Sequence, residues 1–430
     1  MKTLLTLPTF TNGNPGKTTF PFLLVFFLLF SSMSCQKQER EDQESLINLP
    51  EKSAQLIGAD NQFGLELFRK ITDKAGVNDN TMISPLSISL ALSMTYNGAA
   101  GDTKTEMEKT MKLFGLTADQ INNAHRALIE ALKSADPDVK LRIANAIYYD
   151  RMLKVREEFV TVNQKYYDAS VTALNFSSVD ALGIVNGWVS KKTEGKIPTI
   201  IDQIDADLVM ILLNAVYFNG IWKSKFGDKD THALPFRFGN GTSQEVATMS
   251  QETALEYTNN SLFSAVHLPY GKGQYQMTVI LPNAGKSTAD VIAELDNEKW
   301  NEWMKGFRME NKVVVKMPRF KFEWKMKLNE ILSSMGMTSA FTPYVADFSG
   351  INDGRDLFIG YVIHKTYADV NENGTEAAAV TAVGMFTTGM PVDPPQKIYF
   401  TVDRPFLFSI AEKTTGTILF IGEMNAPEYN

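Results

Sequence analysis

The chain has 430 residues, of which 44% are hydrophobic and 21% carry a charged side chain. This composition supplies enough apolar material for a large buried core and excludes a disordered or fibrous protein. The formal net charge of −7 argues against a broad phosphate-binding surface, so we expect no nucleic-acid partner. A single cysteine excludes an internal disulfide, and stability must therefore come from core burial.

The beginning of the chain differs from the rest in composition. Its only charges before Cys35 are Lys2 and Lys17, and an apolar run spans residues 20–30. This apolar run is too short to remain in a bilayer as a spanning helix. We therefore interpret residues 1–34 as a cleavable export signal.

Cys35 follows the short residues SSMS, and this arrangement resembles a bacterial lipoprotein signal, although Ser32 stands where Leu is usual. The resemblance implies that Cys35 becomes a lipidated N-terminus. The alternative is an ordinary signal peptide that is cut nearby and leaves a spare thiol. Residues 35–52 are polar and charged, which is typical of a flexible tether. We expect an exported protein, either lipid-anchored to a membrane at the cell envelope or surface, or secreted.

Residues 53–430 contain no Pro/Gly/Ser-rich linker and no repeat, so we expect one continuous domain. Its first part has the apolar spacing of helices. Capping signals predict where three helices begin: Asn61 for the first, Ser84 followed by Pro85 for the second, and Thr103 with Glu106 for the third.

Strand patterns dominate the later part of the chain. The candidates are rich in β-branched and aromatic residues and are bounded by turn formers: Leu141–Tyr149, Val209–Phe218, Tyr275–Leu281, Val313–Met317, Ile398–Val402, Phe406–Ile410 and Ile418–Gly422. Early helices and late strands, without regular alternation, argue against a doubly wound or barrel enzyme fold. The predicted fold class is α+β.

The sequence offers little for enzyme chemistry. None of its four histidines lies in a paired metal-ligand spacing: His125, His232, His267 and His364. No Gly-x-Ser-x-Gly nucleophile motif and no Gly-rich dinucleotide loop is present. We therefore expect that the protein is not an enzyme and needs no metal or other cofactor.

Residues 372–391 (ENGTEAAAVTAVGMFTTGMP) have an unusual composition. Between Ala377 and Gln396 the only charge is Asp393, and Lys and Arg are absent. The first part alternates as a strand would, and one of its two faces carries small or apolar residues that could be buried: Thr375, Ala377, Ala379, Thr381, Val383 and Met385. The segment is either a loop with strand character or an ordinary core strand followed by a turn.

This segment resembles the hinge and reactive loop of serpins, which typically read as an acidic residue, any residue, Gly, Thr, Glu and a run of Ala. The resemblance extends over nearly the whole body through MISPLSISLALSMTYNGAAGDTKTEM, NAIYYD, VNGWVSKKTEGKI, LLNAVYFNGIW, HLPYGKGQYQMTVILP, MPRFKFE, MGMTSAFTPYVADFSGI, VIHKTYADVNENGTEAAAVTAV and DRPFLFSI. It implies a serpin fold with three β-sheets, eight or nine helices and an exposed reactive loop.

The resemblance also assigns roles to single residues. The hinge would comprise Glu372, Gly374, Thr375, Glu376, Ala377, Ala378 and Ala379. Ser87, Asn186 and His364 match the family's buried polar cluster beneath the sheet that opens, and Trp222 matches the tryptophan at the top of that sheet. From the residues alone, each could equally be a hydrogen-bonded core polar group or a packed indole.

The implied function is inhibition of an endopeptidase by a suicide-substrate mechanism, in which the cleaved loop inserts into the main sheet. The family spacing places the scissile bond at Thr388 and Gly389, with alternatives at Met385, Phe386, Thr387 and Met390. Because the loop has no cationic residue, we expect elastase-like, subtilisin-like or papain-like targets and no trypsin-like target. The alternatives are a non-inhibitory serpin or a surface-binding lipoprotein without protease trapping. We expect a monomer.

Overall fold

The computed structural model describes residues 47, 49–205, 208–354, 357–375 and 396–429. The chain divides into two compact units, residues 1–43 and 44–430, and only the second contains described residues. Across the described ranges, no helix combines the length and apolar character that a membrane span requires. The predicted lipidation site, Cys35, lies outside the described residues.

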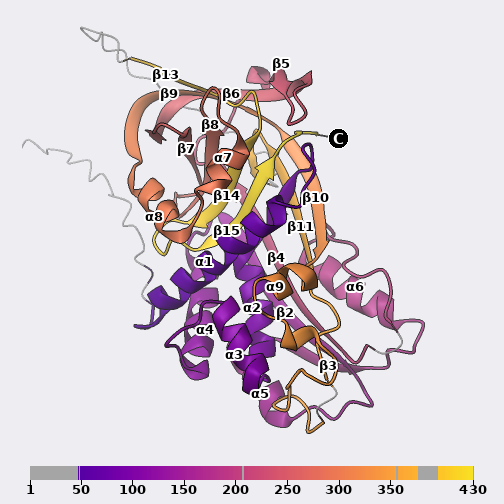
Figure 1. The fold of residues 1–430 in the computed structure, drawn as a ribbon. Coiled ribbons are helices and arrows are strands. Elements are labelled where there is room, and N and C mark those ends of the chain that lie inside the picture. Colours follow the sequence, from indigo (N-terminus) through magenta and orange to yellow (C-terminus); the bar gives the residue numbers. More distant parts are fainter. Residues whose placement is uncertain (1–46, 48, 206–207, 355–356, 376–395, 430) are drawn as a thin grey trace, which may run out of the picture. The chain divides into compact units, whose positions relative to one another are not determined.

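Nine α-helices occur in the described part of the chain (Figure 1). They are α1 (Ser53–Thr72), α2 (Pro85–Tyr96), α3 (Gly101–Thr110), α4 (Ala118–Ser134), α5 (Glu157–Tyr167), α6 (Ala181–Lys192), α7 (Thr288–Ala293), α8 (Asn297–Lys305) and α9 (Asn329–Ser334). The predicted start of α2 is confirmed, because the Ser84 side chain accepts a hydrogen bond from the Ser87 amide and Pro85 is the first helical residue.

The predicted cap of the first helix is wrong. Helix α1 begins eight residues before Asn61, which is buried inside the helix. The Asn61 side chain donates to the Gly416 carbonyl at 2.8 Å and accepts from the Ile418 amide at 3.1 Å. This side chain therefore ties α1 to a distant strand connection, a contact that local sequence cannot reveal.

The predicted capping box of the third helix is also wrong. Helix α3 begins two residues before Thr103, and Ala100 precedes it without a side-chain cap. The Thr103 hydroxyl instead accepts from the Asp347 amide at 2.9 Å, and Glu106 accepts from the Ser339 amide at 2.6 Å. Both side chains thus fasten the later segment around residues 339–347 to this helix.

The smaller sheet has six strands in the order β10-β11-β12-β4-β2-β3. Their bounds are β2 (Val139–Asp150), β3 (Ser170–Leu174), β4 (Met210–Ile221), β10 (Phe320–Lys327), β11 (Ile363–Asn371) and β12 (Gly374–Thr375). All neighbouring strands are antiparallel except β2 and β3, which are parallel.

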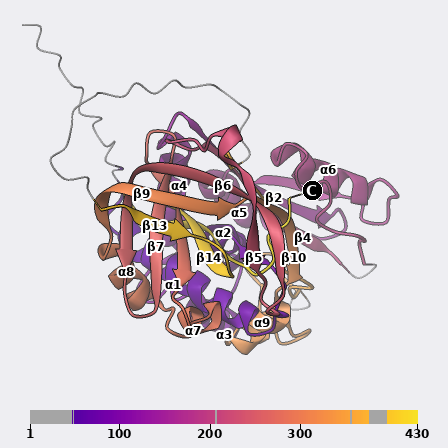
Figure 2. The same cartoon turned by 90° about the horizontal axis from the view of Figure 1, so that it is seen from above.

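The larger sheet follows the path β1-β15-β14-β8-β7-β6-β9-β13, with β5 beside β6. Its strands are β1 (Thr81–Ile83), β5 (His232–Arg237), β6 (Ser243–Asn259), β7 (Phe263–Tyr270), β8 (Tyr275–Pro282), β9 (Arg308–Pro318), β13 (Ile398–Thr401), β14 (Phe406–Glu412) and β15 (Ile418–Met424). The long strand β6 pairs with β5 and β9 and, at its end, with β7, so it joins two groups of strands into one path. Viewed from above, β6, β9 and β13 lie across the same end of the molecule (Figure 2).

The main core lies between the two sheets. Helix α2 contacts both β4 and β15, and its residues are almost all buried. A second apolar cluster covers the opposite face of the smaller sheet, where Val185 and Val189 of α6 pack near Ala146 of β2 and Leu213 of β4. The predicted α+β class is confirmed, and every predicted strand overlaps an observed one.

Candidate functional site

The predicted hinge begins as a tight hairpin at one end of the smaller sheet. Strand β11 ends at Asn371, Glu372 and Asn373 form the turn, and β12 runs back antiparallel to β11. Thr375 is paired with Val370 of β11 on one side and with Gly220 of β4 on the other. The first two strand residues of the hinge therefore already lie inside the sheet.

Gly374 permits this entry because the backbone of β4 comes very close. A Cβ atom at position 374 would lie 2.1 Å from the Gly220 carbonyl oxygen. Its φ angle of +150° is also one that L-residues with a side chain rarely adopt. Any other residue would force the hinge away from β4.

Thr375 is buried and bonded to an aromatic cluster. Its hydroxyl lies 2.7 Å from the hydroxyl of Tyr270, which is also buried, and burial raises the pKa of Tyr270. The Trp222 ring stacks on the Tyr270 ring with centroids 4.3 Å apart. The Trp222 indole N–H donates to the Asn371 carbonyl at 2.8 Å, and its backbone N–H donates to the Asn373 carbonyl at 2.9 Å.

Trp222 therefore lies directly after the last residue of β4, and it holds both ends of the hinge turn. Glu372 is also held in place. Only 7% of its surface is exposed, so its carboxylate needs partners within the protein. Its carboxylate accepts from the Thr231 hydroxyl at 2.6 Å and lies 3.5 Å from the Arg319 guanidinium. The Phe226 amide donates to the Glu372 carbonyl at 3.1 Å. The turn is thus bonded to the segment that follows β4 and to Arg319.

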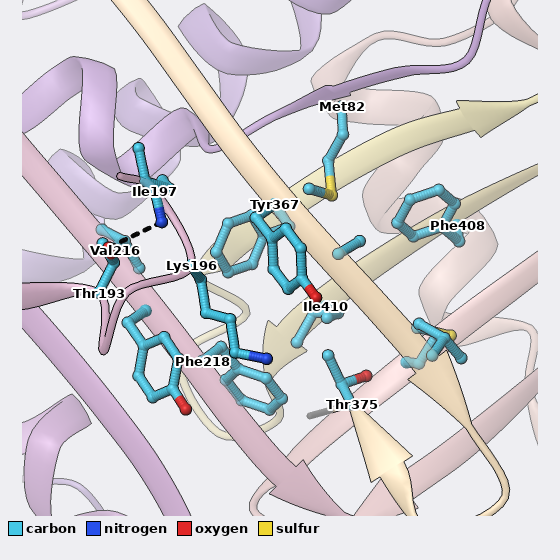
Figure 3. Close-up of a pocket in the computed structure, with 15 residues that line it drawn as sticks. Met82, Thr193, Lys196, Ile197, Val216, Phe218, Tyr367, Thr375, Phe408 and Ile410 are labelled. Carbon is cyan, nitrogen blue, oxygen red and sulfur yellow. Dashed lines mark hydrogen bonds between the residues drawn. The ribbon is translucent and has the colours of Figure 1, made fainter. Parts of the chain in front are cut away.

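Strands β4 and β11 both pair with β12, but within the described residues they do not pair with each other. A pocket lies between them, with Thr375 in its wall (Figure 3). Most of its lining is apolar, and these apolar residues come mainly from β4, β11 and the larger sheet: Val216, Phe218, Ala368, Val370, Met82, Met277, Phe408, Ile410 and Phe420. We call this space the insertion gap.

The segment after α6 also lines the insertion gap. Thr193, Lys196 and Ile197 belong to its wall, and the Lys196 ammonium lies 5.1 Å from the centre of the Tyr367 ring of β11 (Figure 3). On the other side Glu194 is bonded to Lys140 and Arg142 of β2. The segment is thus connected to strands on both sides of the gap.

A second pocket between β4 and β11 contains two of the predicted polar residues. Ser87 of α2 and His364 of β11 both line it, together with Asn214 of β4. His364 accepts a hydrogen bond from the Ser84 amide through Nε2 at 2.9 Å, and burial lowers its pKa to about 3. The imidazole is therefore neutral at physiological pH.

Asn186 is not part of this polar cluster. It lies on α6, where its side chain accepts from the Ile200 amide at 2.9 Å and donates to the Ile201 carbonyl at 2.8 Å. The residue bonded to Ser87 is Asn214, which in turn donates to Asn145 at 2.6 Å. Asn145 and Asn214 are directly paired across β2 and β4, so both can reach beneath the sheet.

Three further residues of the site escape prediction from the sequence: Tyr270, Arg319 and Asn214. The motifs HLPYGKGQYQMTVILP, MPRFKFE and LLNAVYFNGIW contain them, but nothing in those motifs marks one residue above its neighbours. The remaining predicted residues lie outside the described part of the chain: Glu376, Ala377, Ala378, Ala379, Met385, Phe386, Thr387, Thr388, Gly389 and Met390. Among the described residues, no group of three or more His, Cys, Asp or Glu could hold a metal ion.

Comparison with known proteins agrees with this geometry. The family model described as serpin (serine protease inhibitor) matches residues 58–427. Leukocyte elastase inhibitor A of Rattus norvegicus is 33% identical over 385 residues, which cover 87% of this chain and all of that protein.

Two similar solved structures extend the comparison. The native state of the thermophilic serpin tengpin has a TM-score of 0.79 at 33% identity, covering 88% of this chain and 95% of that one. Human thyroxine-binding globulin, solved in complex with thyroxine, has a TM-score of 0.79 at 25% identity, covering 88% of this chain and all of that one. The predicted fold is confirmed, and the chain belongs to the serpin family.

Proposed function

We propose that the protein inhibits an endopeptidase as a suicide substrate. Loop insertion into the main sheet is a known property of inhibitory serpins, and membership of the family supports the same step in this chain. The observation that carries the proposal is the hinge hairpin, whose Gly374 and Thr375 already pair with β11 and β4. A strand that continues from Thr375 would enter the insertion gap.

In this mechanism the protease attacks the loop and becomes acylated, and the cleaved loop then inserts as a strand and carries the protease with it. The protein acts as a trap and not as an enzyme, since the covalent bond is made by the protease. The loop must insert faster than the acyl bond is hydrolysed. Because Gly374 and Thr375 are already in the sheet, the first step of insertion is complete before cleavage.

The energetics place the driving force in side-chain burial. Each inserted residue gains about 0.5–1.5 kcal/mol from hydrogen bonding and loses about 1–2 kcal/mol of conformational freedom. These two contributions nearly cancel, so the inward-facing set that begins with Thr375 must supply most of the gain. The apolar lining of the insertion gap, including Phe218, Ala368 and Phe408, supports this, because it offers a surface that Ala and Val side chains can cover.

We further propose a target that cleaves after small or medium apolar residues, with the scissile bond at Thr388–Gly389 or at Met385, Phe386, Thr387 or Met390. The loop between Ala377 and Gln396 contains no Lys or Arg for a trypsin-like specificity pocket. The similarity to proteins named leukocyte elastase inhibitor supports an elastase-like target. Subtilisin-like and papain-like proteases belong to the same class of target.

The test is a panel of elastase-like, subtilisin-like, papain-like and trypsin-like proteases, each mixed with the protein in equal amounts. We expect a complex that survives boiling in denaturant with at least one of the first three, and mass spectrometry should place the cut between residues 385 and 390. A protease whose nucleophile is chemically blocked is the control and should form no such complex. Fast, stable trapping of trypsin would contradict the proposed specificity, and no complex with any protease would contradict inhibition.

The non-inhibitory alternative is supported by the similarity to thyroxine-binding globulin, which is named for a ligand and not for a protease. Heat stability after loop cleavage separates the two functions. An inhibitory protein should become more heat-stable, since the inserted loop adds a strand. A non-inhibitory protein should be cleaved in the loop without this gain.

We propose that the mature protein begins at Cys35 and is attached to a membrane by lipid. The support is the SSMS sequence before Cys35 and the polar stretch after it. A thioether-linked diacylglycerol carries two acyl chains and would hold the protein firmly, as dual acyl signals do. Cys35→Ala should move the protein into the soluble fraction, and an unmodified mature N-terminus elsewhere in mass spectrometry would contradict the anchor.

A further inference from the structure

The end of the chain returns to the hinge. After β15 the chain is fixed by Asn80, whose side chain accepts from the Ala426 amide and donates to its carbonyl. The Lys321 amide then donates to the Glu428 carbonyl at 2.7 Å. These bonds lead the chain along the start of β10 and place Tyr429 beside Arg319.

Tyr429 contacts Arg319 and lies near the end of β11. The Arg319 guanidinium carbon lies 4.3 Å from the centre of the Tyr429 ring, which is a cation–π distance. The Asp369 carboxylate of β11 lies near enough to the Tyr429 hydroxyl to act on it electrostatically. Burial and the Asp369 carboxylate raise the pKa of Tyr429, so this hydroxyl stays protonated.

Arg319 needs such a contact because its other bonds do not fix its orientation. Its ion pair with Glu372 is single and long, at 3.5 Å, and its buried Nε atom has no hydrogen-bond partner among the described residues. A guanidinium that stacks on an aromatic face loses much of its freedom to rotate. The Tyr429 ring is therefore the contact that turns Arg319 toward Glu372.

We propose that Tyr429 is a positioning residue for the hinge, and that the C-terminal end of the chain thereby controls hinge insertion. Through the stacked Arg319 it holds Glu372. This contact stabilises the turn that directs Gly374 into the sheet. A protease that removes Tyr429, or a partner that withdraws it, would release the turn. The effect on inhibition rests on the proposed function, whereas the effect on the hinge does not.

Hydrogen exchange measured by mass spectrometry tests the effect on the hinge without any protease. The Trp222 and Phe226 amides donate to Asn373 and Glu372, so their exchange reports directly on the hinge turn. In Tyr429→Ala we expect exchange at residues 222–226 to rise about tenfold, within the range that a partly desolvated cation–π contact contributes. Tyr429→Trp should restore protection, whereas Tyr344→Ala, which truncates an exposed tyrosine elsewhere, should not change it.

A double-mutant comparison shows whether Tyr429 acts through Arg319. In the Arg319→Gln background, Tyr429→Ala should increase the exchange rate at residues 222–226 much less than it does in the wild type. Peptides from α4 are the control for general loosening and should keep their protection. Unchanged exchange at residues 222–226 in Tyr429→Ala, or equal increments in both backgrounds, would overturn the proposal.

The effect on inhibition is tested with the full chain and a protease that it traps. The protein without residues 429–430 should form less of the stable complex with the protease and more of the cleaved, free inhibitor. Loss of Asn430 alone should change neither amount. If the wild type traps no protease, the proposed function fails while the exchange result still decides the role of Tyr429. If exchange rises but trapping is unchanged, the C-terminal end positions the hinge without controlling inhibition, and that part of the proposal is overturned.

Discussion

The hydroxyl groups of Tyr270 and Thr375 lie 2.7 Å apart inside the smaller sheet, and both residues are buried. The sequence predicts Thr375 as the first inward-facing residue of a strand that has still to enter the sheet. In the structure this residue has already entered, and a tyrosine from the larger sheet holds it there. The contact between these two hydroxyls therefore holds in place the part of the hinge that already lies in the sheet.

Tyr270→Phe should weaken the hinge, because the Thr375 hydroxyl would stay buried without a partner at a cost of about 1–3 kcal/mol. Hydrogen exchange at residues 370–375 should rise accordingly. Thr375→Val in the same protein should restore protection, since replacing both partners by apolar groups is nearly neutral. Tyr275→Phe is the matched control, because this buried tyrosine is the strand partner of Tyr270, but its hydroxyl bonds to the Leu132 carbonyl and not to the hinge. Equal exchange in Tyr270→Phe and the wild type would show that the bond contributes nothing to the hinge.

Gly374→Ala should expel β12 from the sheet. The new Cβ would meet the Gly220 carbonyl at 2.1 Å, and the φ angle of +150° adds strain. Gly285→Ala is the control, since Gly285 also has a positive φ, but a Cβ atom at that position would have no other atom within 4 Å. We expect lost protection at Gly220 and Ile221 in the first variant only. Intact protection there would mean that the hinge tolerates a side chain at this position.

The polar network under the sheet predicts which asparagine is coupled to Ser87. A double-mutant cycle on urea stability should give a coupling energy of about 0.5–3 kcal/mol for Ser87→Ala with Asn214→Ala, since the two side chains are bonded. The same cycle with Asn186→Ala should give a value near zero, because Asn186 bonds to residues 200–201. A large coupling to Asn186 would support the role that the sequence predicts for that residue.

His364 should make stability depend on pH. Burial lowers its pKa from 6.5 to about 3 in the folded state, so below pH 6.5 the unfolded state binds a proton that the folded state does not. The stabilisation is complete above pH 6.5 and is lost as the pH falls toward 3, by at most about 1.4 kcal/mol per pH unit. Urea unfolding at pH 7.5, 6 and 5 should show the wild type losing stability relative to His364→Gln. Parallel pH profiles of the two proteins would contradict this assignment.

Much of the architecture follows from the sequence, and the exceptions have a common cause. Strands such as β4 and β8 are predictable because runs of β-branched and aromatic residues are short-range signals. The cap of α2 is predictable for the same reason, since Ser84 and Pro85 are adjacent. The predicted role of Asn61 is wrong because its side chain bonds to residues more than 350 positions away.

The site shows the same limit. The hinge composition identifies Gly374 and Thr375, but the partner Tyr270 depends on an isolated bridge between Trp222 and Tyr270 that joins the two sheets. Asn214 and Asn186 look alike in the sequence, and only the pairing of Asn145 with Asn214 places one of them under the sheet. Roles that depend on strand register cannot be assigned before the register is known.

Replacing Thr375 by arginine should turn the inhibitor into a substrate. A charged side chain cannot replace the buried Thr375 without an unpaired charge, which costs several kcal/mol even after relaxation, so β12 should leave the sheet. The acylated protease would then complete hydrolysis before insertion. Glu376→Arg is the matched control, because the period-2 alternation of a strand would turn this next side chain away from the core. Both variants should be cleaved at the same bond as the wild type.

Insertion of the cleaved loop into the sheet is measured most directly by the melting temperature before and after cleavage within residues 376–395. We predict a large rise on cleavage for the wild type and for Glu376→Arg, and little or no rise for Thr375→Arg. An unchanged melting temperature in the cleaved wild-type protein, or an equal rise in Thr375→Arg, would contradict insertion.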